Sequence, residues 1–417
     1  MESRPNATIN PNVAAWQAMP AEGPDTEHPH NSPSSVGTDV IDPVMEPSVS
    51  GTPPKPGFNW RSLRRRLIAA SCVAVAGLAW WCATSITLDY YVLAPGKARD
   101  VGPLVTVEGA EQFVPEGELL FTTVSVRRAT PALAVWDWFD DDSELAPVYV
   151  VDGLQSPDDA KRANQDQMSN AISRSSVVAQ QRLGYTVTEQ GRGAFVLGVE
   201  ADGPSDGVLI EGDIIVKVED VDIEVVADLQ PAVRANPAGT EVTIEVRRAD
   251  LQAGTEELIT RQITLGFNPD AEASYIGVVA ETFERTYDSP VTVRINSGDV
   301  GGPSAGLAFT LAIIDQLTEG DLTGGRTIAV TGTIELDGTV GPISGAEKKV
   351  VAARERGAIA FIVPSALTAT EKELLRRRAG DMRIIGVATL DEAIAAMGEL
   401  GGDVSSIPAP PEAAVAP

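Results

Sequence analysis

An uncharged run of 22 residues, Leu67 to Leu88, constrains the fold of this chain more than any other feature. A helix rises 1.5 Å per residue, so the run would span roughly 33 Å, enough for a bilayer core of about 30 Å. Aromatic side chains favour the membrane interface, and four lie near the C-terminal end of the run: Trp80, Trp81, Tyr90 and Tyr91. The run therefore predicts a transmembrane helix over residues 67–88. A buried core helix is the alternative; a cleaved signal peptide is disfavoured, because a long region precedes the run and no clean A-x-A site follows it.

The flanking residues set the expected orientation of this helix. A basic cluster directly precedes it: Arg61, Arg64, Arg65 and Arg66. The positive-inside rule then puts residues 1–66 in the cytoplasm and everything after residue 88 outside it. Residues 1–57 hold 11 of the 29 prolines and few large apolar residues, so we expect residues 1–60 to be a disordered tail rather than a folded domain. The Pro- and Ala-rich residues 401–417 are expected to be disordered as well.

Composition excludes several kinds of chemistry from the outer part of the chain. The 417 residues suffice for two or three domains, and the net charge is −27, of which −26 lies beyond Arg66. This acidity argues against a nucleic-acid partner, whose phosphates need clustered Lys and Arg. The histidines are His28 and His30, and the cysteines are Cys72 and Cys82. Beyond residue 88 we therefore expect no Ser-His-Asp triad, no Cys-His pair, no histidine-ligated metal and no disulfide.

Residues 89–183 carry no chemical motif and are interpreted as an extracytoplasmic connecting region. Residues 119–126 are of β type and predict a strand. A short helix is expected over residues 132–139, and a longer one over residues 163–183. The strand could belong to the domain that follows later in the chain, which would make the intervening unit an insertion; the sequence leaves this open.

Residues 184–268 predict a separate β-rich unit, with strands at 193–199, 209–218 and 241–247 and a helix near 225–235. The succession G-A-F-V-x-x-V, G-P-S and L-x-x-G-D-I-I resembles PDZ domains, especially those attached to bacterial proteases. PDZ domains bind extended peptides, often C-termini, by adding them to a sheet edge. By this resemblance the carboxylate-binding loop is near Gly193, Ala194 and Phe195, and Val196 to Gly198 form the pairing strand. A β-rich domain without a peptide partner is the alternative.

Strands and helices alternate over residues 270–400, and Ser304 lies at the expected start of an apolar helix, Leu307 to Leu317. Glycines and a proline flank this serine, so backbone N–H groups at the turn could hold a developing oxyanion. The alternative is that Ser304 only caps the helix, which is the usual reason for serine at such a position.

A serine nucleophile without histidine can use a lysine whose pKa is lowered by burial. The helix expected at 344–357 offers two, and Ser344 with Glu347 forms an S-x-x-E pattern typical of a capping box. At 100° per residue Lys349 lies beside the small apolar stripe of this helix, whereas Lys348 projects nearly opposite it. We therefore expect Lys349 to reach a cleft and Lys348 to face solvent. Two ordinary surface lysines are the alternative.

The motifs occur in a characteristic order: G-P-S-A-G at residues 302–306, T-G-x-I at 331–334, and G-x-V-x-P-I-x-G-x-x-x-K at 338–349. This succession resembles the Ser-Lys proteolytic domain of Lon-type peptidases over roughly residues 275–398. The resemblance implies that Ser304 is the nucleophile, that Lys349 is the general base and that Thr331 orients the lysine amine. It departs from ATP-dependent Lon at Gly301, where an acidic residue is common.

The whole arrangement resembles the membrane-anchored, YlbL-like PDZ–Lon proteases of bacteria. The expected fold class is α+β: one transmembrane helix, a β-rich PDZ domain, and a Lon-type α/β domain of the ribosomal protein S5 domain 2-like fold. No G-x-x-x-x-G-K-[ST] phosphate loop occurs, so neither ATP nor another cofactor is expected. The predicted function is ATP-independent endopeptidase activity on extracytoplasmic or membrane proteins recruited or gated by the PDZ domain. The resemblance also implies a possible hexamer, and a non-catalytic membrane adaptor is the alternative.

Overall fold

The computed structural model describes residues 60–153, 155–250 and 255–410. Residues 1–59 of the predicted disordered tail over residues 1–60 lie outside these ranges, and Trp60 is the first residue of a helix. Helix α1 (Trp60–Ser85) is, within them, the one helix long and apolar enough to span a membrane, from Leu63 to Ser85. It ends three residues before the predicted limit at Leu88. The predicted α+β class is confirmed.

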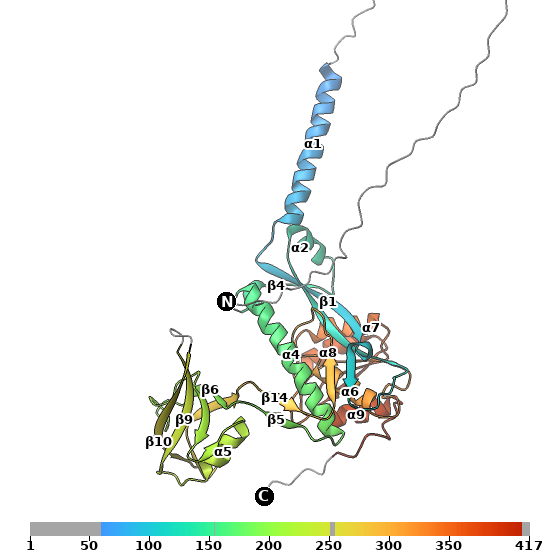
Figure 1. Ribbon diagram of the computed structural model, residues 1–417. Coiled ribbons are helices and arrows are strands. Elements are labelled where there is room, and N and C mark those ends of the chain that lie inside the picture. The colour runs from blue at the N-terminus through green and yellow to red at the C-terminus, as the bar shows by residue number, and fades with distance from the viewer. Residues whose placement is uncertain (1–59, 154, 251–254, 411–417) are drawn as a thin grey trace, which may run out of the picture. The chain divides into compact units, whose positions relative to one another are not determined.

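A six-stranded sheet forms the centre of one domain (Figure 1). Its strands, in spatial order, are β20 (Arg383–Val387), β19 (Ala360–Pro364), β16 (Thr327–Val330), β3 (Glu118–Arg128), β1 (Tyr90–Asp100) and β4 (Glu144–Pro147). The first four run parallel, and β1 is antiparallel to β3 and to β4. Residues 89–183 are therefore more than a connecting region, because they supply three of the six strands of this sheet, β1, β3 and β4.

Strand β3 shows how the two faces of this sheet are filled. Successive side chains of a strand point to opposite faces, and Leu119 and Phe121 belong to one buried cluster while Leu120 belongs to another. The first cluster includes α6 (Gly306–Leu317), whose Phe309 ring lies 5.8 Å from that of Phe121. The second includes α7 (Ala346–Glu355) and α8 (Ala369–Ala379). The domain thus has helices on both faces of its sheet.

Further elements complete this domain. The remaining helices are α2 (Pro131–Asp137), α3 (Val148–Val151), α4 (Pro157–Arg182) and α9 (Leu390–Glu399). The short strand pairs are β2 (Val105–Glu108) with β15 (Thr292–Ile295), β5 (Thr188–Gln190) with β14 (Thr286–Asp288), and β17 (Thr333–Ile334) with β18 (Val340–Gly341). Helix α4 begins six residues earlier than predicted, at a Ser156 cap and Pro157.

The second domain is inserted between α4 and β15. Its sheet has the order β10 (Thr255–Thr264), β9 (Glu241–Asp250), β7 (Ile214–Val218), β6 (Ala194–Val199) and β13 (Val278–Thr282), with β8 (Val221–Asp222) beside β7. The other elements are α5 (Val226–Arg234), β11 (Gly266–Asn268) and β12 (Ala273–Tyr275). The predicted boundary at residue 268 is wrong, because β13 pairs with β6 and extends this domain to Thr282. The β5–β14 pair brings together the two chain segments that lead into and out of the insertion.

The C-terminal segment also differs from the prediction in its described part. Asp403 N donates to Asp321 O at 2.8 Å, and an Arg182 Nη1 donates to Pro408 O at 2.6 Å. Residues 403–408 are thus held against the domain of the six-stranded sheet rather than extending freely. Residues 411–417 of the predicted tail lie outside the described ranges.

Candidate active site

Ser304 lies in the turn that leads from the segment after β15 into α6. The cap of α6 is Ala305, and no side chain caps this helix end. The alternative that Ser304 is an N-cap is therefore excluded. Its carbonyl oxygen is fixed instead, because the Thr331 hydroxyl donates to it at 3.2 Å and Gly332 N donates at 2.9 Å. The hydroxyl of Ser304 is left free to face α7.

Lys349 comes to Ser304 from the first turn of α7. Its Nζ lies 2.7 Å from Ser304 Oγ and 3.3 Å from Thr331 Oγ1. The side chain is only 3% exposed, and this burial lowers the pKa of the amine to about 8, although nearby Glu347 opposes the shift. The structure thus brings the three predicted catalytic residues, Ser304, Lys349 and Thr331, into one hydrogen-bonded group.

The neighbouring Lys348 does not face solvent as predicted. It is 4% exposed, and its Nζ lies 3.2 Å from Glu144 Oε2 on β4 and 3.3 Å from Glu347 Oε1. The helical wheel assumed one buried face, whereas α7 packs against β1, β3 and α8 and is covered on several sides. The predicted capping box is also wrong, because Gly345 is the N-cap and the Ser344 hydroxyl makes no cap hydrogen bond.

A cleft of about 530 Å³ opens in front of the Ser304 hydroxyl. Its walls include apolar side chains from three separate elements: Val124 on β3, Met168 on α4 and Ile343 before α7. Helix α4 also supports the serine turn, because Gly302 N donates to Asn164 O at 2.8 Å. Sequence reasoning did not identify α4 as part of the site, since its residues form no motif.

Close packing against α4 explains the departure at Gly301. A Cβ at this position would lie 3.0 Å from Asn164 Cβ and 3.2 Å from Asn164 O. An acidic side chain there would push the serine turn away from the helix. A glycine at position 301 therefore allows α4 to pack closely against this turn.

The second candidate site lies in the inserted domain, but not where it was predicted. Gly193 N donates to Glu224 O and Gly193 O accepts from Phe283 N, so neither group is available to a peptide. Ala194 and Val196 are fully buried, and Phe195 stacks on Phe283. Residues 194–196 pair with β13 on one side and with β7 or Asp213 on the other. The prediction that β6 is the peptide-pairing strand is therefore wrong.

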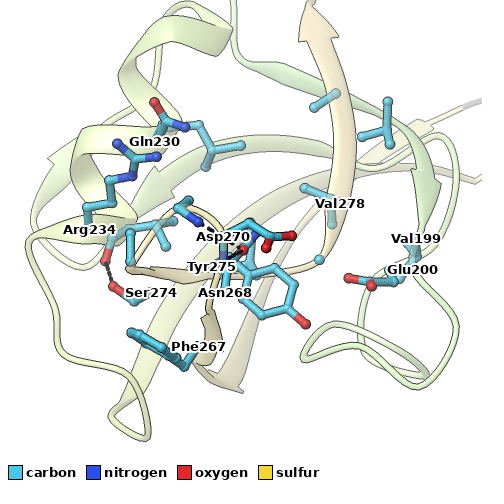
Figure 2. Close-up of a pocket in the computed structure, with 18 of the residues that line it drawn as sticks. Val199, Glu200, Gln230, Arg234, Phe267, Asn268, Asp270, Ser274, Tyr275 and Val278 are labelled. Carbon is cyan, nitrogen blue, oxygen red and sulfur yellow. Dashed lines mark hydrogen bonds between the residues drawn. The ribbon is translucent and has the colours of Figure 1, made fainter.

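A groove of about 830 Å³ lies instead between α5 and β13. Strand β13 is an edge of the sheet, so one side of its backbone is open. Figure 2 shows Gln230 and Arg234 of α5 at one part of this groove and Val278 of β13 at another. Before β13 the chain turns at Gly277, with φ +72°, and among the described residues the N–H groups of Ile276 and Gly277 make no hydrogen bond. Sequence reasoning missed this strand because the prediction ended the domain at residue 268.

A serine hydroxyl beside a buried lysine amine, in an α/β domain with a cleft in front of it, defines a candidate Ser-Lys hydrolase. Residues 269–398 match the Lon protease (S16) C-terminal proteolytic domain, and residues 181–257 match the PDZ domain. The chain thus carries a Lon-type serine protease domain and a PDZ domain, preceded by an apolar helix that is consistent with a YlbL-like arrangement.

The Lon protease relatives agree with the assignment of the proteolytic domain. The chain is 33% identical over 126 residues to a Lon protease of Phenylobacterium zucineum, covering 30% of this chain and 16% of that protein. It is 32% identical over 126 residues to a Lon protease of Chloroflexus aggregans, covering 30% and 15%. The chain thus spans about one sixth of the length of these relatives. The solved PDZ domain of an SdrC-like protein from Listeria monocytogenes is 20% identical, with a TM-score of 0.19, covering 21% of this chain and 87% of that one.

Proposed function

We propose that this protein is a membrane-anchored, ATP-independent serine endopeptidase that cleaves extracytoplasmic polypeptides. The observation that carries the proposal is the 2.7 Å separation of Ser304 Oγ and Lys349 Nζ inside a cleft. Two groups at this distance can transfer a proton directly. A lysine that was buried only for packing would not require a contact between its amine and a serine hydroxyl at the cleft.

The chemistry follows from the protonation state of Lys349. Above a pH of about 8 the amine is neutral and accepts the proton of Ser304 Oγ–H while the oxygen attacks the carbonyl carbon of the substrate. The resulting ammonium returns that proton to the leaving amine as the C–N bond breaks, which leaves an acyl-enzyme. In the second half of the reaction, the neutral amine of Lys349 takes a proton from a water molecule as that water attacks the ester. The amine then passes the proton to Ser304 Oγ as the ester C–O bond breaks, which releases the acid product.

The surrounding groups support both partners. The Thr331 hydroxyl contacts both: it accepts a hydrogen bond from Lys349 Nζ and donates one to Ser304 O. Within the described residues the N–H groups of Ser304 and Ala305 make no hydrogen bond, and they lie at the start of α6. These two N–H groups are our candidates for stabilising the oxyanion.

The PDZ domain would bind peptides along β13. An extended peptide can pair with the open backbone edge of this strand while its side chains enter the groove toward α5. The unpaired N–H groups of Ile276 and Gly277 can form a nest for a terminal carboxylate. Recruitment at this groove would raise the local concentration of substrate segments at the cleft.

Anchoring and ATP independence rest on the N-terminal part and on the sequence. Helix α1 is long enough to span a bilayer, and the arginine cluster at residues 61–66 favours a cytoplasmic N-terminus. The sequence contains no phosphate-loop motif that could power unfolding. Flexible or unfolded segments are therefore the expected substrates.

Cleavage of β-casein by the reconstituted full chain at pH 9, without nucleotide, tests this function. Ser304→Ala and Lys349→Met should abolish cleavage. Lys348→Met is the matched control, since it removes an equally buried lysine that contacts Glu144 and Glu347 rather than Ser304. Unchanged cleavage in either of the first two variants would refute the dyad, and a strict requirement for ATP would refute ATP independence. Digestion of a C-terminal tag by protease added outside intact cells checks the orientation.

A further inference from the structure

An exposed aromatic surface projects from the segment between β3 and α4. Trp136, Trp138 and Phe139, at the end of α2, are 74%, 87% and 83% exposed. Tyr149 and Val150 on the short helix α3 are exposed as well, as is Val135. We call these six residues the aromatic surface: Val135, Trp136, Trp138, Phe139, Tyr149 and Val150. Exposed side chains of this size and apolarity, on two short helices that both pack on β1 and β4, are typical of a surface that another body covers.

The tryptophans of the described chain are confined to two places. Three lie on α1 and two on the aromatic surface, and none occurs after Trp138. Over the described residues beyond 152, Phe267 is the one strongly exposed large aromatic side chain. The exposed aromatics are therefore a local property of the region that follows α1.

The backbone ties this surface to the end of α1. Helix α1 ends at Ser85, and Leu88 N donates to Ala129 O at 2.8 Å, while Ala129 N donates to Tyr90 O at 2.8 Å. Helix α2 begins two residues after Ala129. Its seven residues place Trp136 on the order of 10–15 Å from that hydrogen bond, because a helix rises 1.5 Å per residue. If α1 spans a bilayer, this distance lies within the reach of the interfacial layer, where tryptophan and tyrosine are most favourable.

Ion pairs also join the region of the surface to the catalytic domain. An Arg378 Nη1 on α8 lies 2.8 Å from Asp142 Oδ1, just after the aromatic residues. Glu144 on β4 pairs with Lys348, the neighbour of Lys349 on α7. These contacts would hold the catalytic domain at a fixed distance from the membrane once the surface has inserted.

The charges near the surface disfavour an anionic partner. Asp137 accepts a hydrogen bond from Ser143, Asp140 accepts one from Asp142 N, and Asp142 pairs with Arg378. The segment thus carries acidic groups and no basic side chain from Ala129 to Leu154. Insertion would depend on apolar contact rather than on attraction to anionic lipid.

We propose that the aromatic surface inserts into the interfacial layer of the membrane that α1 spans, giving the catalytic domain a second point of attachment. This inference rests on the proposed membrane anchoring. It predicts binding to a purely zwitterionic bilayer, with little dependence on salt.

Depth-dependent fluorescence quenching tests the inference in the full chain reconstituted in phosphatidylcholine vesicles. Cys72→Ala and Cys82→Ala remove the native thiols, and Trp138→Cys introduces a site for a bimane label. Ile359→Cys is the matched control, because it adjoins the Glu118 end of β3, roughly 33 Å along the strand from Arg128. We expect spin-labelled lipid to quench the label at 138 at least threefold more than the label at 359, and aqueous iodide to show the reverse preference.

Each other outcome overturns the inference in a distinguishable way. Equal quenching of both labels by iodide, in a chain that resists extraction by sodium carbonate, would refute the second attachment and leave the anchor intact. Extraction of the chain by carbonate would refute the anchor itself. Protection of the label at 138 from both quenchers, varying with the protein-to-lipid ratio, would instead show that a second copy of the chain covers the surface.

Discussion

Lys349 Nζ and Ser304 Oγ lie 2.7 Å apart, although 45 residues separate them in the chain. Two elements create this meeting: β16 ends at Val330, directly before Thr331, whose hydroxyl donates to Ser304 O, and α7 carries the lysine in its first turn. Because the amine is buried, its charged form is disfavoured and its pKa falls to about 8. The geometry and the protonation state together make the pair fit for catalysis near neutral to mildly alkaline pH.

The first prediction concerns the pH dependence of cleavage. Only neutral Lys349 can accept the serine proton, so kcat/KM for a fluorogenic peptide should rise with pH and level off above about pH 8. Two pH units below that pKa, at about pH 6, activity should be roughly a hundredfold lower. Lys349→Arg should be inactive throughout, because arginine stays protonated. Equal activity from pH 6 to 10 would contradict lysine as the base.

The second prediction separates the role of the Thr331 hydroxyl from its packing. Thr331→Val keeps the shape of this buried side chain but removes contacts to Lys349 Nζ and Ser304 O. Losing these two contacts, each worth about 1 kcal/mol, should reduce kcat roughly thirtyfold, with a smaller effect on KM. Thr331→Ser keeps the hydroxyl and should retain most of the rate. If both variants lose the same activity, the hydroxyl is not what matters.

The third prediction assigns peptide binding to the groove along β13. Arg234 on α5 lines this groove. Just before the proposed carboxylate nest, the Ser274 hydroxyl donates to the carbonyl oxygens of Val233 and Asn236 at the end of the same helix. Arg234→Glu should weaken binding of a labelled peptide with an apolar C-terminus and a free carboxylate by about three- to tenfold. Fluorescence anisotropy with the C-terminally amidated peptide is the control, and its weaker binding should change little. An equal loss for both peptides would point to a general distortion of α5.

The candidate catalytic residues could be found from the sequence because each belongs to a motif with fixed spacing. Ser304 follows a Gly-Pro turn, and Lys349 lies beside the apolar stripe of its helix. Lys348 was misplaced because a wheel describes one helix, whereas burial depends on β1 and β4 packing from outside it. Helix α8 carries a T-x-x-E pattern at Thr368 and Glu371 that does form a capping box, and this signal could have located it.

Other features depend on contacts between distant segments. Strand β3 was expected from its β-type residues, but its place beside β16 is set by pairing across some 200 residues of chain, including the whole PDZ insertion. The groove at β13 could not be predicted while residues 278–282 were assigned to the other domain. A sequence pattern identifies which residues favour a strand, and it does not say which sheet they join.

The last prediction concerns Asp315, which is buried on α6 and accepts a hydrogen bond from Leu322 N at 2.9 Å. Burial raises the pKa of this carboxyl to about 7, and Asp321 and Asp100 act in the same direction. Between about pH 4 and 7 the folded chain therefore keeps a proton that the unfolded chain has released, so stability falls as pH rises. The contribution is at most about 1.4 kcal/mol per pH unit, and it ends above pH 7.

Asp315→Asn keeps an acceptor oxygen for Leu322 N but cannot ionise. The variant should resemble the wild-type chain near pH 4 and become the more stable of the two by pH 8, as urea midpoints followed by circular dichroism would show. Asp337→Asn is the control, because hydrogen bonds from Thr339 lower the pKa of that exposed carboxyl and its titration lies below this range. If the wild-type and Asp315→Asn midpoints stay parallel from pH 4 to 8, Asp315 does not titrate on unfolding in this window.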